Sequence, residues 1–416
     1  MAEDIRLSKV EILIQQQKFA EAEKILQNLL IEDSGNLNYL SLLAEVYLQQ
    51  DQFDKANSII ENAIGLSPDV SYLFYMKSRI AIQQGNSKQA EQSIRQAIEL
   101  DPDDADYFAL LANIKLWQKQ FSTALEIADQ ALEINAENLL ALNTRSTALN
   151  KLNRTEESFI TIENALREDP NNPYTHSNYG WGLLEKGDHK KALIHFQEAL
   201  KRNPEMEHAQ LGILEALKAK NPIYRLFLKY AFWMGNMTSQ YQWGFIIGFY
   251  VLYRILRSIA NNIESLQPFI NPLLVILAVF AFSTWIINPI SNLFLRFNKY
   301  GQLLLDKKEK MSSNFVAISA GIFLICLVLY LVTQNTLFML PAAFGFAMML
   351  PVSVMFSPTK YKNALVFYTA GLAVVGIAAI GTTFTTGALF SIWTTIFILA
   401  FFVFQWVANF MIIGDD

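Results

Sequence analysis

The sequence predicts an all-α protein in which a solenoid of helical repeats is followed by a polytopic bundle of transmembrane helices. A small residue recurs every 34 residues through the first half of the chain, which indicates stacked repeats. Apolar runs of roughly 20 residues, the length that crosses a bilayer, fill the second half. The charges divide in the same place: residues 1–220 contain 22 Lys and Arg against 33 Asp and Glu, and residues 221–416 contain 11 against 5.

Each 34-residue unit is expected to form two short helices that cross at small side chains. A small residue marks the start of the second helix, and another position that is mostly alanine follows seven residues later. These positions are Ala22, Ala56, Ala90, Ala124, Ser158 and Ala192, followed by Leu29, Ala63, Ala97, Ala131, Ala165 and Ala199. Five residues further on, four of the units have a proline, at Pro68, Pro102, Pro170 and Pro204. Because proline cannot continue a helix, it ends the second helix of each of these units.

This pattern resembles the tetratricopeptide repeat family. The resemblance covers residues 3–220, as six repeats plus a capping helix, and departs from the family pattern at Ser34, Ala136 and Ser158. It implies an α-solenoid, because one unit cannot bury its own apolar face and neighbouring units must stack. It also implies a concave groove, lined by the first helix of each unit, that binds peptides or protein partners.

The repeat frame assigns nine residues to this protein-binding groove. They are Asn38, Tyr72, Tyr75, Arg79, Asn113, Asn143, Thr147, Tyr174 and Trp181. Tyrosine, tryptophan and arginine are the residues that most often anchor protein interfaces. The alternative is that some of the nine only pack against the next repeat. Some family members bind a C-terminal carboxylate with lysines, but the matching positions here include Ala109 and Tyr174, so that ligand class is not expected.

The segment 221–240 is predicted to be a basic, aromatic juxtamembrane helix. Asn221 and Pro222 end the solenoid, and Arg225 and Lys229 then lie one helical turn apart among aromatic residues. Such a helix suits the lipid headgroup layer, with its cations beside anionic lipids. The alternative is an amphipathic helix that docks on the last repeat.

Residues 241–413 are predicted to form a transmembrane domain of five to six helices. The apolar runs are about 241–260, 269–290, 315–333, 337–356, 364–384 and 388–412. The first run is the weakest candidate for a spanning helix, because it contains Arg254 and Arg257. It could lie flat on the membrane surface instead. These two arginines are candidates for binding an anionic lipid or a partner's carboxylate, or simply for anchoring at the interface.

Loop charge favours six spans, with the repeats and both termini in the cytoplasm. The connections at 296–310 and 357–363 are basic, whereas "TQNT" and "TTFTTG" carry no charge. Basic loops stay on the cytoplasmic side. Five spans would put the repeats outside, although the N-terminus has no apolar signal segment to export them. The glycine-rich run 371–381 is expected to form a close helix contact, either within the chain or with an integral-membrane partner or second copy.

No residue pattern indicates catalysis, a metal or a cofactor. The single cysteine, Cys326, excludes an internal disulfide and a cysteine-based zinc site. The four histidines are expected to be packing or surface residues, and no known catalytic motif occurs. The acidic repeat half argues against a nucleic-acid partner, which would require a basic face.

The sequence therefore favours a non-enzymatic, membrane-anchored scaffold. Its repeats would recruit protein partners to the cytoplasmic face of the cell (inner) membrane, for example during assembly of a membrane complex. This layout resembles bacterial inner-membrane proteins that fuse tetratricopeptide repeats to several spans. The alternative function is a transporter or lipid-handling protein with a regulatory repeat domain, although ionisable residues lie only at the ends of the last five apolar runs. A membrane enzyme with an unrecognised active site is the third, least supported hypothesis.

Overall fold

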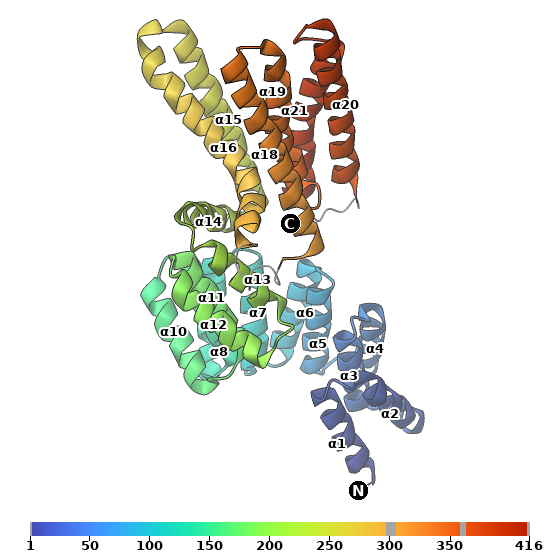
Figure 1. Cartoon of the computed structure of the whole chain (residues 1–416). Helices are drawn as coiled ribbons and strands as arrows, with labels where there is room; N and C mark the ends of the chain where they lie inside the picture. The colour runs from blue at the N-terminus through green and yellow to red at the C-terminus, as the bar shows by residue number, and fades with distance from the viewer. Residues whose placement is uncertain (1, 297–304, 358–362, 414–416) are drawn as a thin grey trace. The chain divides into compact units, whose positions relative to one another are not determined.

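The computed structural model describes residues 2–296, 305–357 and 363–413, and every regular element in these ranges is a helix (Figure 1). The predicted all-α class is therefore confirmed. The chain divides into two compact units, Met1–Gly182 and Leu183–Asp416. The predicted boundary near residue 220 lies inside the second of these units, which contains the second helix of the sixth repeat as well as the apolar helices.

The first unit is a series of antiparallel helix pairs. Their bounds are α1 (Ala2–Gln15), α2 (Phe19–Glu32), α3 (Leu37–Gln49), α4 (Phe53–Leu66), α5 (Ser71–Gln83), α6 (Ser87–Leu100), α7 (Ala105–Trp117), α8 (Phe121–Ile134), α9 (Leu139–Lys151), α10 (Thr155–Glu168) and α11 (Pro173–Lys186), the last of which runs into the second unit. In this scheme α1, α3, α5, α7, α9 and α11 are the first helices of the six repeats.

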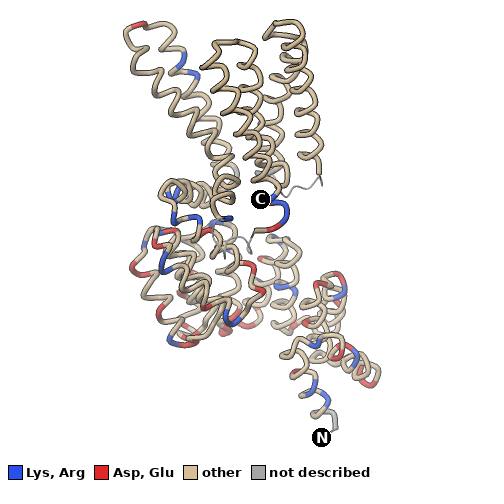
Figure 2. The backbone as a smooth tube through the Cα atoms, viewed as in Figure 1, with Lys and Arg blue, Asp and Glu red and all other residues tan. Residues whose placement is uncertain are grey.

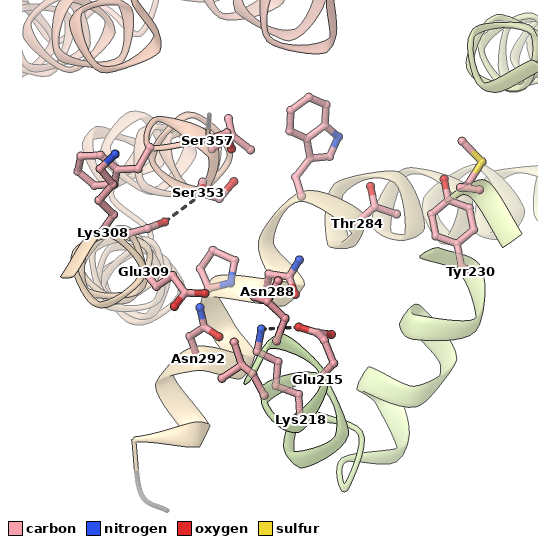
Figure 3. A pocket seen from close by; sticks show the side chains of 18 of the residues that line it. Glu215, Lys218, Tyr230, Thr284, Asn288, Asn292, Lys308, Glu309, Ser353 and Ser357 are labelled. Carbon is pink, nitrogen blue, oxygen red and sulfur yellow. Dashed lines mark hydrogen bonds and ion pairs between the residues drawn. The ribbon is translucent and has the colours of Figure 1, made fainter. Parts of the chain in front are cut away.

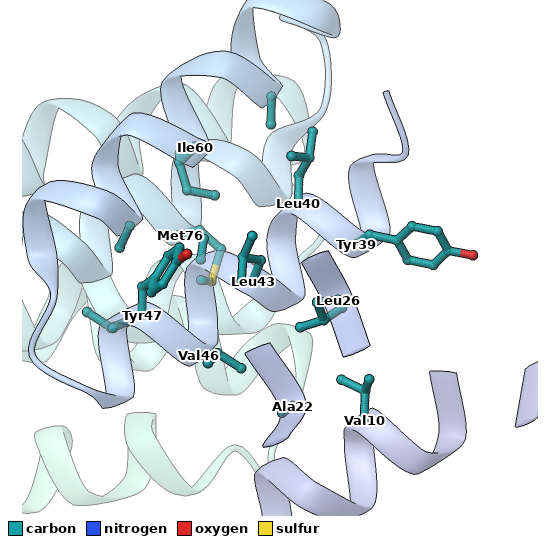
Figure 4. Close-up of a cluster of buried hydrophobic side chains, with 14 of the residues drawn as sticks. Val10, Ala22, Leu26, Tyr39, Leu40, Leu43, Val46, Tyr47, Ile60 and Met76 are labelled. Atoms are coloured by element: carbon teal, nitrogen blue, oxygen red, sulfur yellow. The ribbon is translucent and has the colours of Figure 1, made fainter. Parts of the chain in front are cut away.

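The small repeat residues are buried where the helices cross, as the spacing predicts. The marker positions from Ala22 to Ala192 are at most 3% exposed, so the two backbones of each pair approach closely. Larger side chains such as Leu26, Leu43 and Met76 fill the space between successive pairs (Figure 4). The prolines at 68, 102 and 170 each come two residues after the last residue of a helix, which agrees with their expected role.

The turn inside each repeat has a feature that the sequence analysis did not identify. The backbone adopts a positive φ at residues 17, 51, 85, 119, 153 and 187, again 34 residues apart. Glycine, which adopts this conformation without strain, occupies two of these positions, Gly85 and Gly187. The other four residues are not glycine, so composition alone does not reveal the repeated turn.

The second unit begins with the end of the repeats. Three helices, α12 (His189–Arg202), α13 (Glu207–Lys218) and α14 (Pro222–Gly235), precede the apolar helices. The apolar helices are α15 (Ser239–Asn262), α16 (Gln267–Leu295), α18 (Lys307–Thr333), α19 (Met339–Val354), α20 (Ala364–Thr386) and α21 (Ile392–Ile413), with short 3₁₀ turns at Glu264–Leu266 and Thr336–Phe338.

Six helices in the described ranges are long and apolar enough to cross a membrane. Their charged residues gather near the helix ends (Figure 2). Helices α18 to α21 share an apolar core that includes Val316, Leu372 and Phe404. The helices differ in how many residues of their most apolar stretch are buried inside the protein. The buried share is 44% in Thr336–Val354 and 0% in Glu264–Leu295. Helix α16 therefore exposes an apolar surface that water would not favour.

Gly345 of α19, outside the glycine-rich run, lies close against the backbone of another apolar helix. A Cβ at Gly345 would lie 2.7 Å from the backbone nitrogen of Phe323 and 2.8 Å from the carbonyl oxygen of Ser319, both in α18. In the run 371–381, Gly376 packs against the rings of Phe344 and Phe397. A Cβ at Gly371 or Gly381 would meet nothing within 4 Å, so this part of the run is not a tight contact within the chain.

Candidate functional site

The first helices of repeats two to four carry a cluster of aromatic and charged side chains, here called the first-helix face. Tyr72 and Tyr75 lie on α5 with ring centroids 5.9 Å apart, and Tyr75 lies 5.3 Å from Tyr107 of α7. Tyr72 is 43% exposed although it is a large aromatic residue. The Tyr107 hydroxyl is 3.1 Å from the hydroxyl of Ser71 on α5. This hydrogen bond holds the Tyr107 ring against the preceding repeat.

Arg79 connects this aromatic group to the preceding repeat. Its guanidinium donates hydrogen bonds of 2.6 and 3.1 Å to the two carboxylate oxygens of Glu45 on α3, and it lies 5.8 Å from the centre of the Tyr75 ring. Burial opposes its charge, but the bonds to Glu45 outweigh burial and raise the pKa of Arg79. Burial disfavours the charged phenolate and therefore raises the pKa of Tyr72 and Tyr75. The face therefore presents neutral phenols beside a fixed, paired cation at neutral pH.

Glu45 and Tyr107 were not among the nine residues predicted from the sequence. Glu45 occupies the same repeat position as Arg79, Asn113, Thr147 and Trp181, each 34 residues apart. Opposite charges at one repeat position in successive units are the signal that could have predicted the Glu45–Arg79 pair, since neighbouring first helices pack side by side.

Three of the predicted groove residues make bonds inside the stack. The Asn143 amide donates to the Thr175 hydroxyl at 2.9 Å and to its own helix, and its oxygen accepts from Asn178 at 3.2 Å. Asn113 is 6% exposed, with its amide 3.5 Å from the Thr144 hydroxyl. Thr147 donates to the Asn143 carbonyl. The bonds of Asn113 and Asn143 cross to the next repeat and match the alternative of packing between repeats, whereas the Thr147 bond lies within its own helix. We base no ligand contact on these three residues.

The other three predicted residues lie nearer to solvent. Asn38 is exposed at the start of α3, Tyr174 is 40% exposed at the start of α11, and Trp181 is half-buried further along α11. With Tyr72, Tyr75 and Arg79, they leave six of the nine residues as candidates for partner contact.

A buried polar network joins α13, α14 and α16 in the second unit. Lys218, whose side chain is 3% exposed, donates to Glu215 at 2.9 Å. The Tyr224 hydroxyl lies 2.6 Å from the other Glu215 oxygen and 2.7 Å from the amide oxygen of Asn288. Both oxygens are placed to accept from the hydroxyl, and the Glu215 carboxylate is the stronger acceptor of its single proton. Burial and the nearby Glu215 raise the pKa of Tyr224, so the phenol stays neutral.

Helix α14 has one docked side and one exposed apolar side. Tyr224 and Leu228 are buried, and Asn236 at the end of α14 donates to Glu185 of the last repeat at 3.0 Å. Ile223, Leu226 and Trp233 are 68%, 72% and 47% exposed. The docked side matches the alternative of docking on the last repeat, and location at the membrane surface stays a prediction to which the exposed apolar side chains are suited.

Three of the four predicted headgroup contacts are exposed, and the fourth is partly exposed. Lys229 is exposed and Arg225 partly exposed on α14, and both Arg254 and Arg257 are exposed near the C-terminal end of α15. Lys299, Lys360 and Lys362, which contribute to the basic-loop argument, lie outside the described residues. Among the described residues there is no group of three His, Cys, Asp or Glu side chains that could hold a metal ion.

Comparison with known families identifies the N-terminal half of this chain as a tetratricopeptide-repeat region. Two tetratricopeptide repeat models match, one at residues 13–62 and 47–114 and the other at residues 173–206. These matches confirm the repeat resemblance over the matched residues, and repeats of this kind are scaffolds for protein–protein interaction. No curated protein matches the chain.

Solved structures with the same repeats are similar over about half of the chain. YrrB, described as a TPR protein with an unusual peptide-binding site, is 17% identical, with 44% of this chain and 95% of that chain covered and a TM-score of 0.32. A thermophilic TPR protein from Thermus thermophilus is 16% identical over 44% and 99%, with a TM-score of 0.41. A tetratricopeptide repeat protein from Parabacteroides merdae is 15% identical over 51% and 84%, with a TM-score of 0.46.

Proposed function

We propose that this protein is a membrane-anchored scaffold whose first-helix face binds a segment of a partner protein at the cytoplasmic surface of the cell (inner) membrane. The observation that carries the proposal is the exposed Tyr72 beside Tyr75 and the Glu45–Arg79 pair. Rigid aromatic rings supply contact area at little conformational cost, and arginine supplies directed hydrogen bonds, which is why both are common at interface hot spots.

The bound segment is expected to be polar enough to use this surface. The phenols of Tyr72 and Tyr75 donate and accept hydrogen bonds, and the Arg79 guanidinium has donors beyond the two that bond Glu45. An acidic or amide side chain beside an apolar one fits that combination. Recruitment of such a segment during assembly of a membrane complex remains part of the same proposal.

Anchoring is supported by the exposed apolar surface of the second unit. No residue in the most apolar stretch of α16 is buried inside the protein. Large side chains such as Phe269, Val275 and Ile276 are 62% to 75% exposed. A bilayer covers such a surface without any further protein. The uncharged connections at 334–335 and 387–391 face outward in the six-span orientation, and the basic connections face the cytoplasm.

Replacing Tyr72 and Tyr75 together by alanine is expected to abolish partner recruitment. A single hot-spot aromatic residue contributes about 2 kcal/mol or more, so removal of both rings should lower the affinity by at least about 30-fold. The measurement is quantitative mass spectrometry of proteins that co-purify with the intact protein from its native membrane after mild crosslinking, in wild type and variant.

The matched control is Ile160→Ala, which removes an exposed apolar side chain from the second helix of repeat five. This variant should recruit as the wild type does. Unchanged recruitment by the tyrosine variant, with the repeats still folded by circular dichroism, would overturn the assignment of the first-helix face.

The six-span orientation predicts which connections react with an impermeant maleimide in intact cells. With Cys326 replaced by alanine, a cysteine introduced at Gln334 should be labelled from outside. A cysteine introduced at Lys308 should be labelled only after the membrane is opened. Labelling of the Lys308 position in intact cells would show that the repeats face outward and would contradict the proposed orientation.

A further inference from the structure

The second unit contains an open cavity of about 1250 Å³ between its repeat end and its apolar helices. Helices α13 and α14 form one side, and α15, α16, the start of α18 and the end of α19 form the others. Figure 3 shows side chains from these elements surrounding the space. The volume exceeds the roughly 300–1,000 Å³ typical of small-molecule sites, so it can hold part of a lipid.

One part of the cavity is apolar and aromatic. Helices α14, α15 and α16 contribute Tyr230, Met234, Phe245, Phe249, Phe280 and Trp285. Tyr230 and Phe280 meet edge to face at 5.2 Å, and Tyr230 also lies 6.4 Å from Phe245. These rings belong to or adjoin the helices that we propose cross the membrane. This part of the cavity therefore suits a hydrocarbon chain.

The other part of the cavity is polar and predominantly acidic. Its lining includes four carboxylates, Glu207, Glu215, Asp306 and Glu309, and two ammonium groups, Lys218 and Lys308. Lys218 is already paired with Glu215, whereas Lys308 is exposed at the start of α18. The cavity therefore favours a ligand with a positive group over one with only a negative charge.

The side-chain oxygen of Asn292 on α16 is a hydrogen-bond acceptor that no donor among the described residues satisfies. Asn292 lines the cavity and is 4% exposed. A buried polar atom without a partner costs about 1–3 kcal/mol. Glu309 lines the same cavity (Figure 3), which therefore offers a donor both an amide oxygen and a carboxylate.

Pro289 removes one helical hydrogen-bond donor from the same stretch of α16. Proline has no N–H, so the carbonyl of Trp285, four residues earlier, lacks its usual helical donor. Both residues line the cavity. Beside the partnerless Asn292 oxygen, a ligand with an N–H donor suits this end of the cavity.

We propose that this cavity binds a membrane lipid whose headgroup ends in a primary ammonium. The ammonium would donate to Asn292 and Glu309, the lipid phosphate would lie near Lys308, and one acyl chain would lie among the aromatic side chains of α14, α15 and α16. The inference rests on the proposed membrane location, but it requires no partner on the first-helix face.

The test uses native mass spectrometry of the full chain, released from detergent after incubation with lipids of identical acyl chains. Equal amounts of phosphatidylethanolamine, phosphatidylcholine and phosphatidylglycerol compete. Phosphatidylcholine has the same charges as phosphatidylethanolamine but no N–H donor. Because a hydrogen bond to a charged group contributes about 1.5–3 kcal/mol, phosphatidylethanolamine should be retained at least about tenfold over phosphatidylcholine.

Asn292→Leu is the decisive variant. It removes a partnerless buried acceptor and keeps a similar volume, so the lipid-free protein should be as stable as the wild type or more stable. The preference for phosphatidylethanolamine over phosphatidylcholine should fall to near unity. The matched control is Asn262→Leu at the end of α15, where the amide bonds only its own helix, and this variant should keep the preference.

A second variant tests occupancy by steric exclusion. Ala281→Trp places a large side chain in the aromatic part of the cavity and should reduce retention of all three lipids. Equal retention of phosphatidylethanolamine and phosphatidylcholine by the wild type would overturn the proposal, as would preferential retention of phosphatidylglycerol. An Asn292→Leu variant that keeps the wild-type preference would also overturn it. Each of these results leaves partner recruitment by the first-helix face unaffected, so the two proposals fail separately.

Discussion

Replacing Glu215 with leucine is expected to loosen α13 and α14 from α16. Lys218 would then keep a buried ammonium, 3% exposed, with only the face of the Tyr224 ring at 5.7 Å to stabilise it. Removing one partner of a buried ion pair costs about 3–5 kcal/mol. The Tyr224 hydroxyl would also lose the carboxylate to which it donates.

Hydrogen–deuterium exchange of the full-length protein in detergent measures this effect locally. A cost of this size should reduce the protection of the α13 and α14 amides by about two to four orders of magnitude, provided that exchange follows local opening. Protection in the first unit should not change. Glu207→Gln, on the same helix but outside the network, is the matched control and should leave the exchange of α13 as in the wild type.

The double variant Glu215→Leu with Lys218→Met separates charge burial from packing. Apolar residues of similar size often replace a buried ion pair with little loss of stability. The double variant should therefore recover most of the protection that Glu215→Leu loses. A double variant as poorly protected as the single one would show that the network stabilises the junction by shape and not by compensation of the Lys218 charge.

Gly345→Ala is expected to force α18 and α19 apart. Its Cβ would lie 2.7 Å from the backbone nitrogen of Phe323 and 2.8 Å from the carbonyl oxygen of Ser319. Neither atom belongs to a side chain that could rotate away, so the helices themselves must shift. Overpacking typically costs about 1–3 kcal/mol, and we expect the upper end of that range here because the clash is between backbones.

The thermal unfolding midpoint of the purified protein in detergent tests this expectation. Gly345→Ala should lower the midpoint clearly. Gly371→Ala is the matched control, because it also adds one methyl group to an apolar helix, at a position with nothing within 4 Å. The control should be neutral or slightly stabilising, since alanine favours a helix by about 0.5–1 kcal/mol over glycine. Equal midpoints for both variants would contradict the close contact at Gly345.

The sequence predicted the repeats well because each one imposes the same steric requirement. A small residue must lie at each helix crossing, so the 34-residue spacing is visible without knowledge of the contacts, and the structure confirms burial from Ala22 to Ala192. The apolar helices were equally predictable, since length and composition suffice. All six predicted spans coincide with long helices.

Contacts between elements distant in the chain were not predictable in the same way. Nothing near Gly345 in the sequence shows that Ser319 and Phe323 approach it, whereas the more conspicuous run 371–381 has two glycines facing open space. The cavity likewise depends on α16, which carries Asn288 and Asn292, packing beside α13, α14 and α18, and this requires the tertiary fold. Asn113 and Asn143 show the same limit, because the repeat frame places them on the first helices but cannot distinguish solvent from a neighbouring repeat.

Site-specific photo-crosslinking in the native membrane tests the central claim most directly. A photoreactive amino acid is placed at Tyr72 on the first-helix face or, as a control, at Ile160 on a second helix. The scaffold account predicts a defined protein crosslinked at position 72, its absence at position 160, and its loss when Tyr75 and Arg79 are also replaced by alanine. No protein crosslink at position 72 above the level at position 160 would contradict the account.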